Sequence, residues 1–143
     1  MMKTKGSRVA AALLVAALSL LLVGCAGNNQ QSGEPAKGEA MYHQLAQEEA
    51  KKRMDSGDPV VILDVRTQAE YDAGHIAGAV LLPNEKIGEE MPTELPDKNA
   101  EILIYCRSGN RSAQAARKLV EMGYTAVYDF GGINSWPYDL VAK

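Results

Sequence analysis

Beyond residue 40, the hydrophobic positions alternate between short continuous runs and stretches with helical spacing or composition. Continuous apolar runs bounded by turn residues are typical of strands buried in a parallel sheet. Runs that fit this description, the first of them weakly, lie at 42–45, 60–63, 80–82, 101–105 and 125–128. Helical segments are expected at 47–54, which is rich in Glu, Ala and Lys, and at 112–122, whose apolar residues recur at helical spacing. This alternation predicts an α/β domain with a mainly parallel sheet.

Local signals set several boundaries of these elements. Thr67 followed by Glu70 is the pattern of a capping box and predicts a short helix that runs through Ala73. Gly123 is expected to end the helix at 112–122, because glycine readily adopts the left-handed conformation of a helix C-terminus.

A different hydrophobic pattern precedes the domain. Residues 9–23 form an uncharged apolar run that follows the basic residues Lys3, Lys5 and Arg8. This arrangement is typical of a secretory signal peptide, and the run is short for a membrane-spanning helix of about 20 residues. We therefore expect residues 1–24 to be a signal peptide.

The end of the signal suggests a lipid anchor. Leu22-Val23-Gly24-Cys25 resembles a bacterial lipobox, which implies cleavage before Cys25 and lipidation of that cysteine. Residues 25–39 are poor in apolar side chains and are expected to form a flexible tether to the membrane. The protein would then lie in the bacterial cell envelope on the extracytoplasmic side, in the periplasm or on the outer surface. An uncleaved anchor and cleavage without a lipid remain alternatives.

Charge limits the partners of the exported chain. The full 143-residue sequence has a net charge of −3, and all 18 acidic residues lie after residue 25. Removing the signal peptide removes three of the 15 basic residues, so the remaining chain carries a net charge of −6. This balance disfavours nucleic acid and other polyanions. Residues 40–143 are expected to form one domain and to act as a monomer.

The candidate chemistry lies between a predicted strand and a predicted helix. Residues 106–112 read Cys106-Arg107-Ser108-Gly109-Asn110-Arg111-Ser112, and we call them the Cys106 loop. Backbone N–H groups in such a loop, the helix N-terminus and nearby cations all stabilise an anion, including a thiolate. These surroundings lower the pKa of a cysteine and make it nucleophilic. A buried structural cysteine is the alternative.

Several separated motifs together carry a resemblance to a known family. In chain order they are Asp64-Val65-Arg66, Glu70-Tyr71, Gly74-His75-Ile76, Gly78-Ala79, Pro83, the Cys106 loop, Gly131-Gly132 and Trp136-Pro137. This set resembles a single-domain rhodanese. The resemblance implies a three-layer α/β fold, with a small five-stranded sheet flanked by helices. It also implies sulfur transfer through a persulfide on Cys106.

The residues of the loop suit that reaction on chemical grounds. A donor such as thiosulfate is a dianion, so attack by a thiolate brings two negative charges together. Arg107 and Arg111 are expected to supply positive charge, and the N–H groups from Arg107 through Ser112 can surround the sulfur. Gly109 permits a tight loop. A thiophile such as cyanide or a thiol would then remove the outer sulfur.

The spacing of the loop distinguishes it from a phosphate-binding loop. Cysteine phosphatases with a similar loop place an arginine six positions after the nucleophile, but that position here is Ser112, and Arg111 comes one residue earlier. The spacing therefore favours a sulfur donor over a phosphoryl group. Phosphatase or arsenate reductase activity is the less favoured alternative.

The remaining motif residues are expected to support the site. Asp64 and Arg66 are predicted to form an ion pair or to bind nearby backbone, and His75 to orient its loop, although a role as general base is an alternative. No cofactor is expected. No metal site is expected either, since the sequence after residue 24 has no cysteine besides Cys25 and Cys106, and no close pair of histidines.

Two other uses of Cys106 stay open. The domain could be a sulfur carrier or a redox-sensing module without turnover. Cys106 could also form a disulfide with Cys25, which export would permit, although lipidation would consume the Cys25 thiol.

Overall fold

The computed structural model describes residues 41–88 and 90–142. The predicted signal peptide, Cys25 and the whole predicted tether lie outside the described residues. Within them, no helix has the length and apolar character that crossing a membrane requires.

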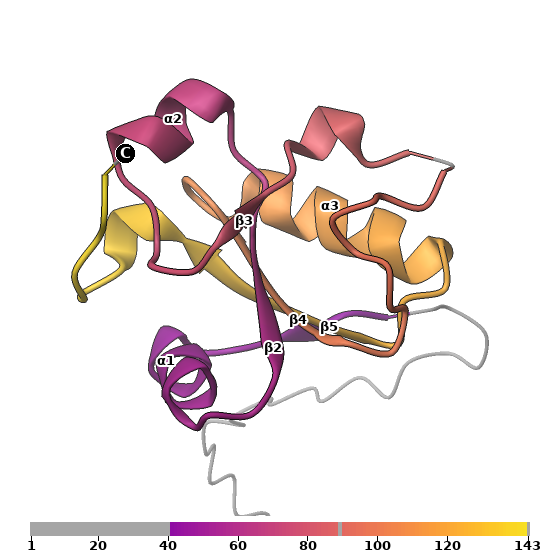
Figure 1. The fold of residues 1–143 in the computed structure, drawn as a ribbon, viewed down its shortest axis with the longest axis horizontal. Coiled ribbons are helices and arrows are strands. Elements are labelled where there is room, and N and C mark those ends of the chain that lie inside the picture. Colours follow the sequence, from indigo (N-terminus) through magenta and orange to yellow (C-terminus); the bar gives the residue numbers. More distant parts are fainter. Residues whose placement is uncertain (1–40, 89, 143) are drawn as a thin grey trace, which may run out of the picture. The chain divides into compact units, whose positions relative to one another are not determined.

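The core of the domain is a five-stranded sheet with the order β1-β5-β4-β2-β3. Its strands are β1 (His43–Gln44), β2 (Val60–Asp64), β3 (Val80–Leu81), β4 (Glu101–Cys106) and β5 (Ala126–Gly132). Every pairing between neighbouring strands is parallel, so the predicted α/β fold is confirmed and the sheet is parallel throughout. The carboxyl ends of β2, β4 and β5 therefore meet at one edge of the sheet (Figure 1).

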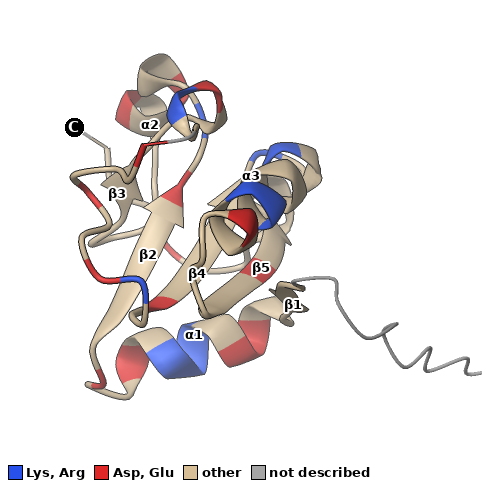
Figure 2. Cartoon of the chain, turned by 90° about the vertical axis from the view of Figure 1, so that its right-hand side faces the viewer, with Lys and Arg blue, Asp and Glu red and all other residues tan. Residues whose placement is uncertain are grey.

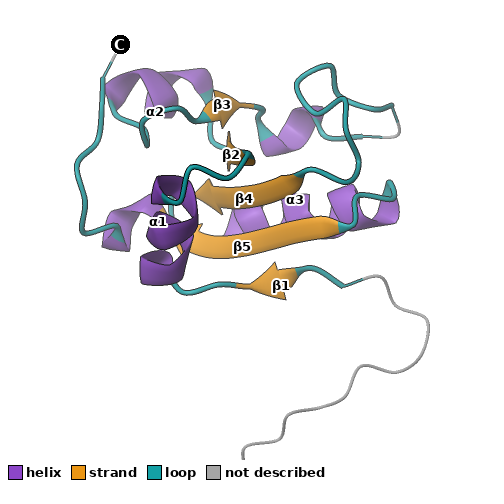
Figure 3. Ribbon diagram, turned by 60° about the horizontal axis from the view of Figure 1, so that its bottom comes forward, coloured by secondary structure: helices purple, strands orange, loops and turns teal. Residues whose placement is uncertain are grey.

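Helices cover both faces of the sheet. Figure 3 shows α1 (Gln47–Asp55) in front of the sheet and α3 (Asn110–Glu121) behind it. Alternate residues of β4 face opposite sides, because side chains alternate along a strand. Ile102, Ile104 and Cys106 pack into the cluster that contains α3 residues. Leu103 and Tyr105 pack into the cluster that contains Ala50 of α1.

The short helix α2 (Gln68–Ala73) follows β2, and it begins as predicted. The Thr67 hydroxyl accepts a hydrogen bond from the Glu70 N–H at 3.3 Å, and the Glu70 carboxylate accepts one from the Thr67 N–H at 3.1 Å. The two bonds complete a capping box. Short 3₁₀ turns follow at Asn84–Lys86 and Ile133–Ser135.

The structure departs from the sequence prediction around the Cys106 loop. Helix α3 begins at Asn110, two residues before the predicted start at Ser112, and β4 extends by one residue to Cys106. Gly109 explains the early start, because its φ of 98° turns the chain sharply from the loop into the helix. Strand β5 runs to Gly132, well past the predicted end at residue 128, and Cys106 pairs with Gly132 across the sheet.

The two main helices differ in charge. In Figure 2, α1 carries both acidic and basic residues, whereas α3 carries mainly basic ones. Arg111, in the first turn of α3, lies at the edge of the sheet where the Cys106 loop also lies.

The C-terminal aromatic residues Trp136 and Tyr138 cover the core to different degrees. Trp136 is only 9% exposed, and the centroid of its ring lies 5.4 Å from that of Phe130. Tyr138 lies edge-on to Trp136 at 4.9 Å but is 36% exposed. Trp136 is therefore a core residue, whereas Tyr138 covers the core from its rim.

Candidate active site

Cys106 is the last residue of β4, and its side chain lies beneath the first turn of α3. The thiol is buried, with 1% of the residue exposed, and no other free cysteine lies within the described residues. The Gly109 N–H donates a hydrogen bond to Cys106 Sγ at 3.0 Å. The loop therefore curls around the sulfur, as predicted for an anion held by backbone N–H groups.

The balance of burial and hydrogen bonding favours the thiolate. Burial by itself raises the pKa of the Cys106 thiol. The Ser112 backbone N–H and hydroxyl, together with the backbone N–H groups of Ser108 and Gly109, outweigh this effect and bring the pKa below its usual value. Cys106 is thus a buried cysteine with the electrostatic setting of a nucleophile.

The loop rests on the end of β5. A Cβ on Gly132 would lie 2.5 Å from the Arg107 carbonyl oxygen and 2.6 Å from Ser108 Cα, so only glycine fits there. The Asn134 N–H donates to the Arg107 carbonyl at 3.2 Å. The Gly131-Gly132 motif thus forms the end of β5, where Gly132 allows the two backbones to approach closely.

Arg111 is bound to a carboxylate. Its Nη1 and Nη2 donate to the two carboxylate oxygens of Glu70, each at 2.8 Å. Hydrogen bonding to Arg111 lowers the pKa of Glu70 to about 2, so Glu70 is ionised at neutral pH. The charge that Arg111 was expected to offer a substrate is therefore largely balanced by Glu70.

The remaining polar residues of the loop have separate roles. Ser112 is fully buried and donates from its hydroxyl to the Gly109 carbonyl at 3.0 Å. Asn110 accepts a hydrogen bond from Gln114 Nε2 at 2.8 Å on the exposed side of α3. Arg107 and Ser108 are exposed.

Asp64 and Arg66 form a buried ion pair beside the site. Arg66 Nε lies 2.9 Å from Asp64 Oδ1, and Arg66 Nη2 lies 2.6 Å from Asp64 Oδ2. Arg66 Nη2 also donates to the Gly74 carbonyl at 2.8 Å, which ties the end of β2 to the end of α2. Asp64 and Arg66 thus form an ion pair and also bind nearby backbone, as predicted.

His75 also contacts the protein framework. Its Nδ1 lies 2.8 Å from the Tyr71 carbonyl oxygen, and its ring stacks on Tyr71 at 3.6 Å. Its backbone pairs with Val141 in an isolated antiparallel bridge. These contacts connect α2 to the C-terminal segment.

Asp129 is a site residue that sequence reasoning did not find. It is 6% exposed, and its Oδ1 accepts a hydrogen bond from the Gly131 N–H at 3.0 Å. Burial raises the pKa of Asp129, while the Gly131 N–H and the Ser112 hydroxyl act in the opposite direction. The sequence signal was an acidic residue in a buried strand, two positions before the Gly131-Gly132 pair.

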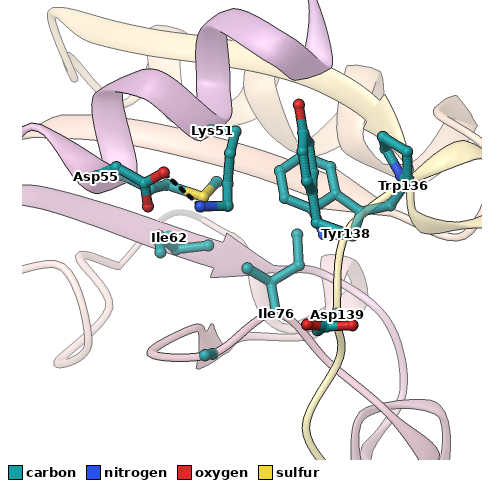
Figure 4. A pocket seen from close by; sticks show the side chains of 10 residues that line it. Lys51, Asp55, Ile62, Ile76, Trp136, Tyr138 and Asp139 are labelled. Atoms are coloured by element: carbon teal, nitrogen blue, oxygen red, sulfur yellow. Dashed lines mark hydrogen bonds and ion pairs between the residues drawn. The ribbon is translucent and has the colours of Figure 1, made fainter.

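A pocket lies near α1, away from the Cys106 loop. It has a volume of about 570 Å³, and Figure 4 shows Lys51, Asp55, Ile62, Ile76, Trp136, Tyr138 and Asp139 around it. Lys51 and Asp55 form an ion pair at its edge. No residue of the Cys106 loop lines it, so it is separate from the Cys106 thiol. Within residues 41–88 and 90–142, no group of three His, Cys, Asp or Glu residues could hold a metal ion.

The arrangement of loop, sheet and motif residues matches a known family across most of the domain. The pattern of the rhodanese-like domain fits residues 46–138. The chain belongs to the rhodanese-like domain family. It is a rhodanese-family sulfurtransferase, an enzyme of the thiosulfate sulfurtransferase kind.

Individual rhodaneses show the same similarity. The thiosulfate sulfurtransferase PspE of Escherichia coli is 41% identical over 71 residues, which cover 50% of this chain and 68% of that protein. The thiosulfate sulfurtransferase GlpE of Coxiella burnetii is 39% identical over 97 residues, covering 67% of this chain and 88% of the relative. The crystal structure of a rhodanese-like domain protein from Staphylococcus aureus superposes with a TM-score of 0.62. It is 33% identical and covers 71% of this chain and 98% of its own.

Proposed function

We propose that Cys106 accepts a sulfane sulfur from a small anionic donor such as thiosulfate and passes it, as a persulfide, to a thiophilic acceptor. The observation that carries this proposal is the buried Cys106 sulfur, whose pKa is lowered by the N–H groups of its loop. Two relatives that carry the name thiosulfate sulfurtransferase support the choice of donor.

In the first step, the Cys106 thiolate attacks the outer sulfur of thiosulfate. A sulfur–sulfur bond forms to Cys106, the sulfur–sulfur bond of thiosulfate breaks, and sulfite leaves with the electron pair. The backbone N–H groups that hold the thiolate can hold the persulfide in the same way. Because these N–H groups are fixed by the fold, they need little rearrangement during the reaction.

In the second step, cyanide or a thiolate attacks the outer sulfur of the persulfide. The new bond joins the acceptor to that sulfur, and Cys106 leaves as a thiolate. Its lowered pKa makes Cys106 a good leaving group as well as a ready nucleophile. No cofactor enters either step.

Intact-mass measurement tests the proposal directly. Incubation with thiosulfate should add the mass of one sulfur to the protein, and Cys106→Ser should abolish the gain. Cyanide should then restore the original mass and release thiocyanate. An unchanged mass of the wild-type protein after thiosulfate would contradict the proposal. A stable persulfide with almost no turnover would instead indicate a sulfur carrier.

We also propose that the enzyme is a lipoprotein held by Cys25 on the extracytoplasmic side of the bacterial envelope. The support is the apolar run at 9–23 and the lipobox-like residues before Cys25. Cells grown with labelled palmitate should label the wild-type protein but not Cys25→Ala. Equal labelling of both proteins would contradict lipidation at Cys25.

A further inference from the structure

Of the three arginines near Cys106, two are paired with a carboxylate and one is not. Arg66 is paired with Asp64, and Arg111 is paired with Glu70. Arg107 directly follows the nucleophile, is exposed, and takes part in none of the ion pairs of the described residues. The guanidinium of Arg107 is therefore the unbalanced positive charge beside Cys106.

Arg107 lines a pocket of about 260 Å³ between the Cys106 loop, α2 and the C-terminal segment. We call it the Arg107 pocket; its lining includes Arg66, Glu70, Arg107, Ile133, Asn134 and Leu140. Its apolar side chains are those of Ala73, Ile133 and Leu140, and Leu140 is 44% exposed. The pocket thus combines one unbalanced cation with an accessible apolar wall.

We propose that the Arg107 pocket binds the sulfur acceptor, and that the acceptor is a small thiol bearing a carboxylate. This inference rests on the persulfide chemistry proposed above and names the class of acceptor that the same site takes. The pairing of Arg66 and Glu70 with residues of their own leaves the pocket with a net charge of about +1, which one carboxylate would neutralise.

The geometry of arginine favours a carboxylate as the bound group. A guanidinium can donate two parallel hydrogen bonds to the two oxygens of a carboxylate. Arg107 directly follows Cys106 in the chain, and consecutive Cα atoms are about 3.8 Å apart, so the pocket that Arg107 lines lies beside the Cys106 loop. A short alkyl chain between carboxylate and thiol would lie against Ile133 and Leu140.

The sulfur transfer to this acceptor breaks one sulfur–sulfur bond and forms another. The acceptor thiolate attacks the outer sulfur of the Cys106 persulfide, a sulfur–sulfur bond forms on the acceptor, and the bond to Cys106 breaks. The persulfide anion left by the first half-reaction takes up one proton from water, Cys106 leaves as a thiolate, and that proton stays on the transferred sulfur. The products are the acceptor persulfide and the free enzyme, and no further oxidant or reductant is needed.

A single-turnover experiment isolates this step. The full-length protein is loaded with thiosulfate, freed of excess donor, and mixed with mercaptopropionate or with its neutral analogue mercaptopropionamide. Loss of the outer sulfur is followed by intact mass at increasing thiol concentration, and rates are expressed per thiolate. Arg107→Gln is compared with Arg107→Lys and with Lys52→Gln, which removes a positive charge from a side chain that is 75% exposed on α1.

We expect the wild-type enzyme to prefer the carboxylate thiol. Arg107→Gln should lower the second-order rate with mercaptopropionate roughly fivefold, the effect of losing one exposed ion pair, and leave the amide nearly unchanged. Arg107→Lys should recover part of the loss, Lys52→Gln should react as the wild type does, and added salt should reduce the preference.

Two results would overturn the inference. One is an equal rate for the two thiols in the wild-type enzyme, and the other is an equal loss with both thiols in Arg107→Gln. Neither result depends on the first half-reaction, because every variant is assayed after the persulfide has been confirmed by mass. A protein that never gains the sulfur would count against the proposed function and not against the choice of acceptor.

Discussion

At the scale of single residues, Ser112 is the side chain that most directly supports the thiolate. Its hydroxyl and its N–H both lower the pKa of Cys106. Ser112→Ala keeps the N–H and removes the hydroxyl, so the pKa of Cys106 should rise. The hydroxyl donates to the Gly109 carbonyl at 3.0 Å and so also holds the turn that points the Gly109 N–H at the sulfur. At neutral pH its removal should lower the rate of alkylation by iodoacetamide roughly three- to tenfold.

The pH profile of alkylation checks the cause of this loss. Ser112→Ala should shift the profile to higher pH and leave the rate at high pH, where Cys106 is fully ionised, close to that of the wild type. A lower rate at every pH with an unmoved profile would show that the hydroxyl affects access to the sulfur and not its ionisation.

Asp129 presents a second test at this scale. Its Oδ1 holds the Gly131 N–H, and the Gly131 carbonyl in turn lies 3.4 Å from the Ser112 hydroxyl. Asp129→Asn keeps an oxygen acceptor for Gly131, whereas Asp129→Ala removes it. We expect Asp129→Ala to slow persulfide formation roughly tenfold and Asp129→Asn to retain most of the rate. The rate is measured by rapid mixing with thiosulfate followed by intact mass. Equal losses in both variants would mean that the charge of Asp129, and not its hydrogen bond, supports the site.

At the scale of elements, the contact between β5 and the Cys106 loop depends on a glycine. A Cβ on Gly132 would meet the backbone of Arg107 and Ser108. Gly132→Ala must therefore displace the loop, and we expect persulfide formation to fall at least about tenfold, because such loops tolerate little misplacement. Gly88→Ala is a matched control, since a Cβ at the exposed Gly88 has no neighbour within 4 Å.

The two glycine variants are compared by rate and by thermal unfolding. Gly132→Ala should lose activity at temperatures where its circular dichroism is still native, whereas Gly88→Ala should keep both. Full activity in Gly132→Ala would show that the loop and β5 can separate without cost to the reaction.

At the scale of the whole molecule, the sequence predicted the alternating elements well, because each depended on a local pattern. The buried run at 101–105 and the capping box of Thr67 and Glu70 both appear in the structure. The loop that curls around the Cys106 sulfur could likewise be predicted, because its residues are consecutive. The errors at the start of α3 and the end of β5 arise where loop and strand contact one another.

Contacts between distant residues account for what sequence reasoning missed. Glu70 was assigned to a helix cap, yet it also binds Arg111, 41 positions away. The role of Arg111 as an open anion clamp was inferred from its place in the loop, where its partner on α2 could not be seen. Asp129 was missed because its effect on the site depends on Ser112, which becomes its neighbour only when α3 packs against β5.

The Glu70–Arg111 pair leads to a prediction about acid stability of the whole domain, since it ties α2 to α3. The pKa of Glu70 is lowered from 4.5 to about 2 in the folded protein, chiefly by its hydrogen bonds with Arg111. A carboxyl whose pKa is lowered by folding stabilises the fold above its unfolded pKa. That contribution is lost as the pH falls from about 4.5 through 2.

Glu70→Gln should therefore be less stable than the wild type at neutral pH, and the difference should shrink below pH 4.5 and vanish near pH 2. Because 27% of the Glu70 side chain is exposed, screening by water reduces the difference at neutral pH to roughly 1–2 kcal/mol. Urea unfolding at a series of pH values measures it. Glu94→Gln supplies a control, because it removes an exposed carboxylate that takes part in none of the ion pairs of the described residues. A difference between Glu70→Gln and the wild type that stays constant from neutral to acidic pH would show that the side chain stabilises α2 by packing alone.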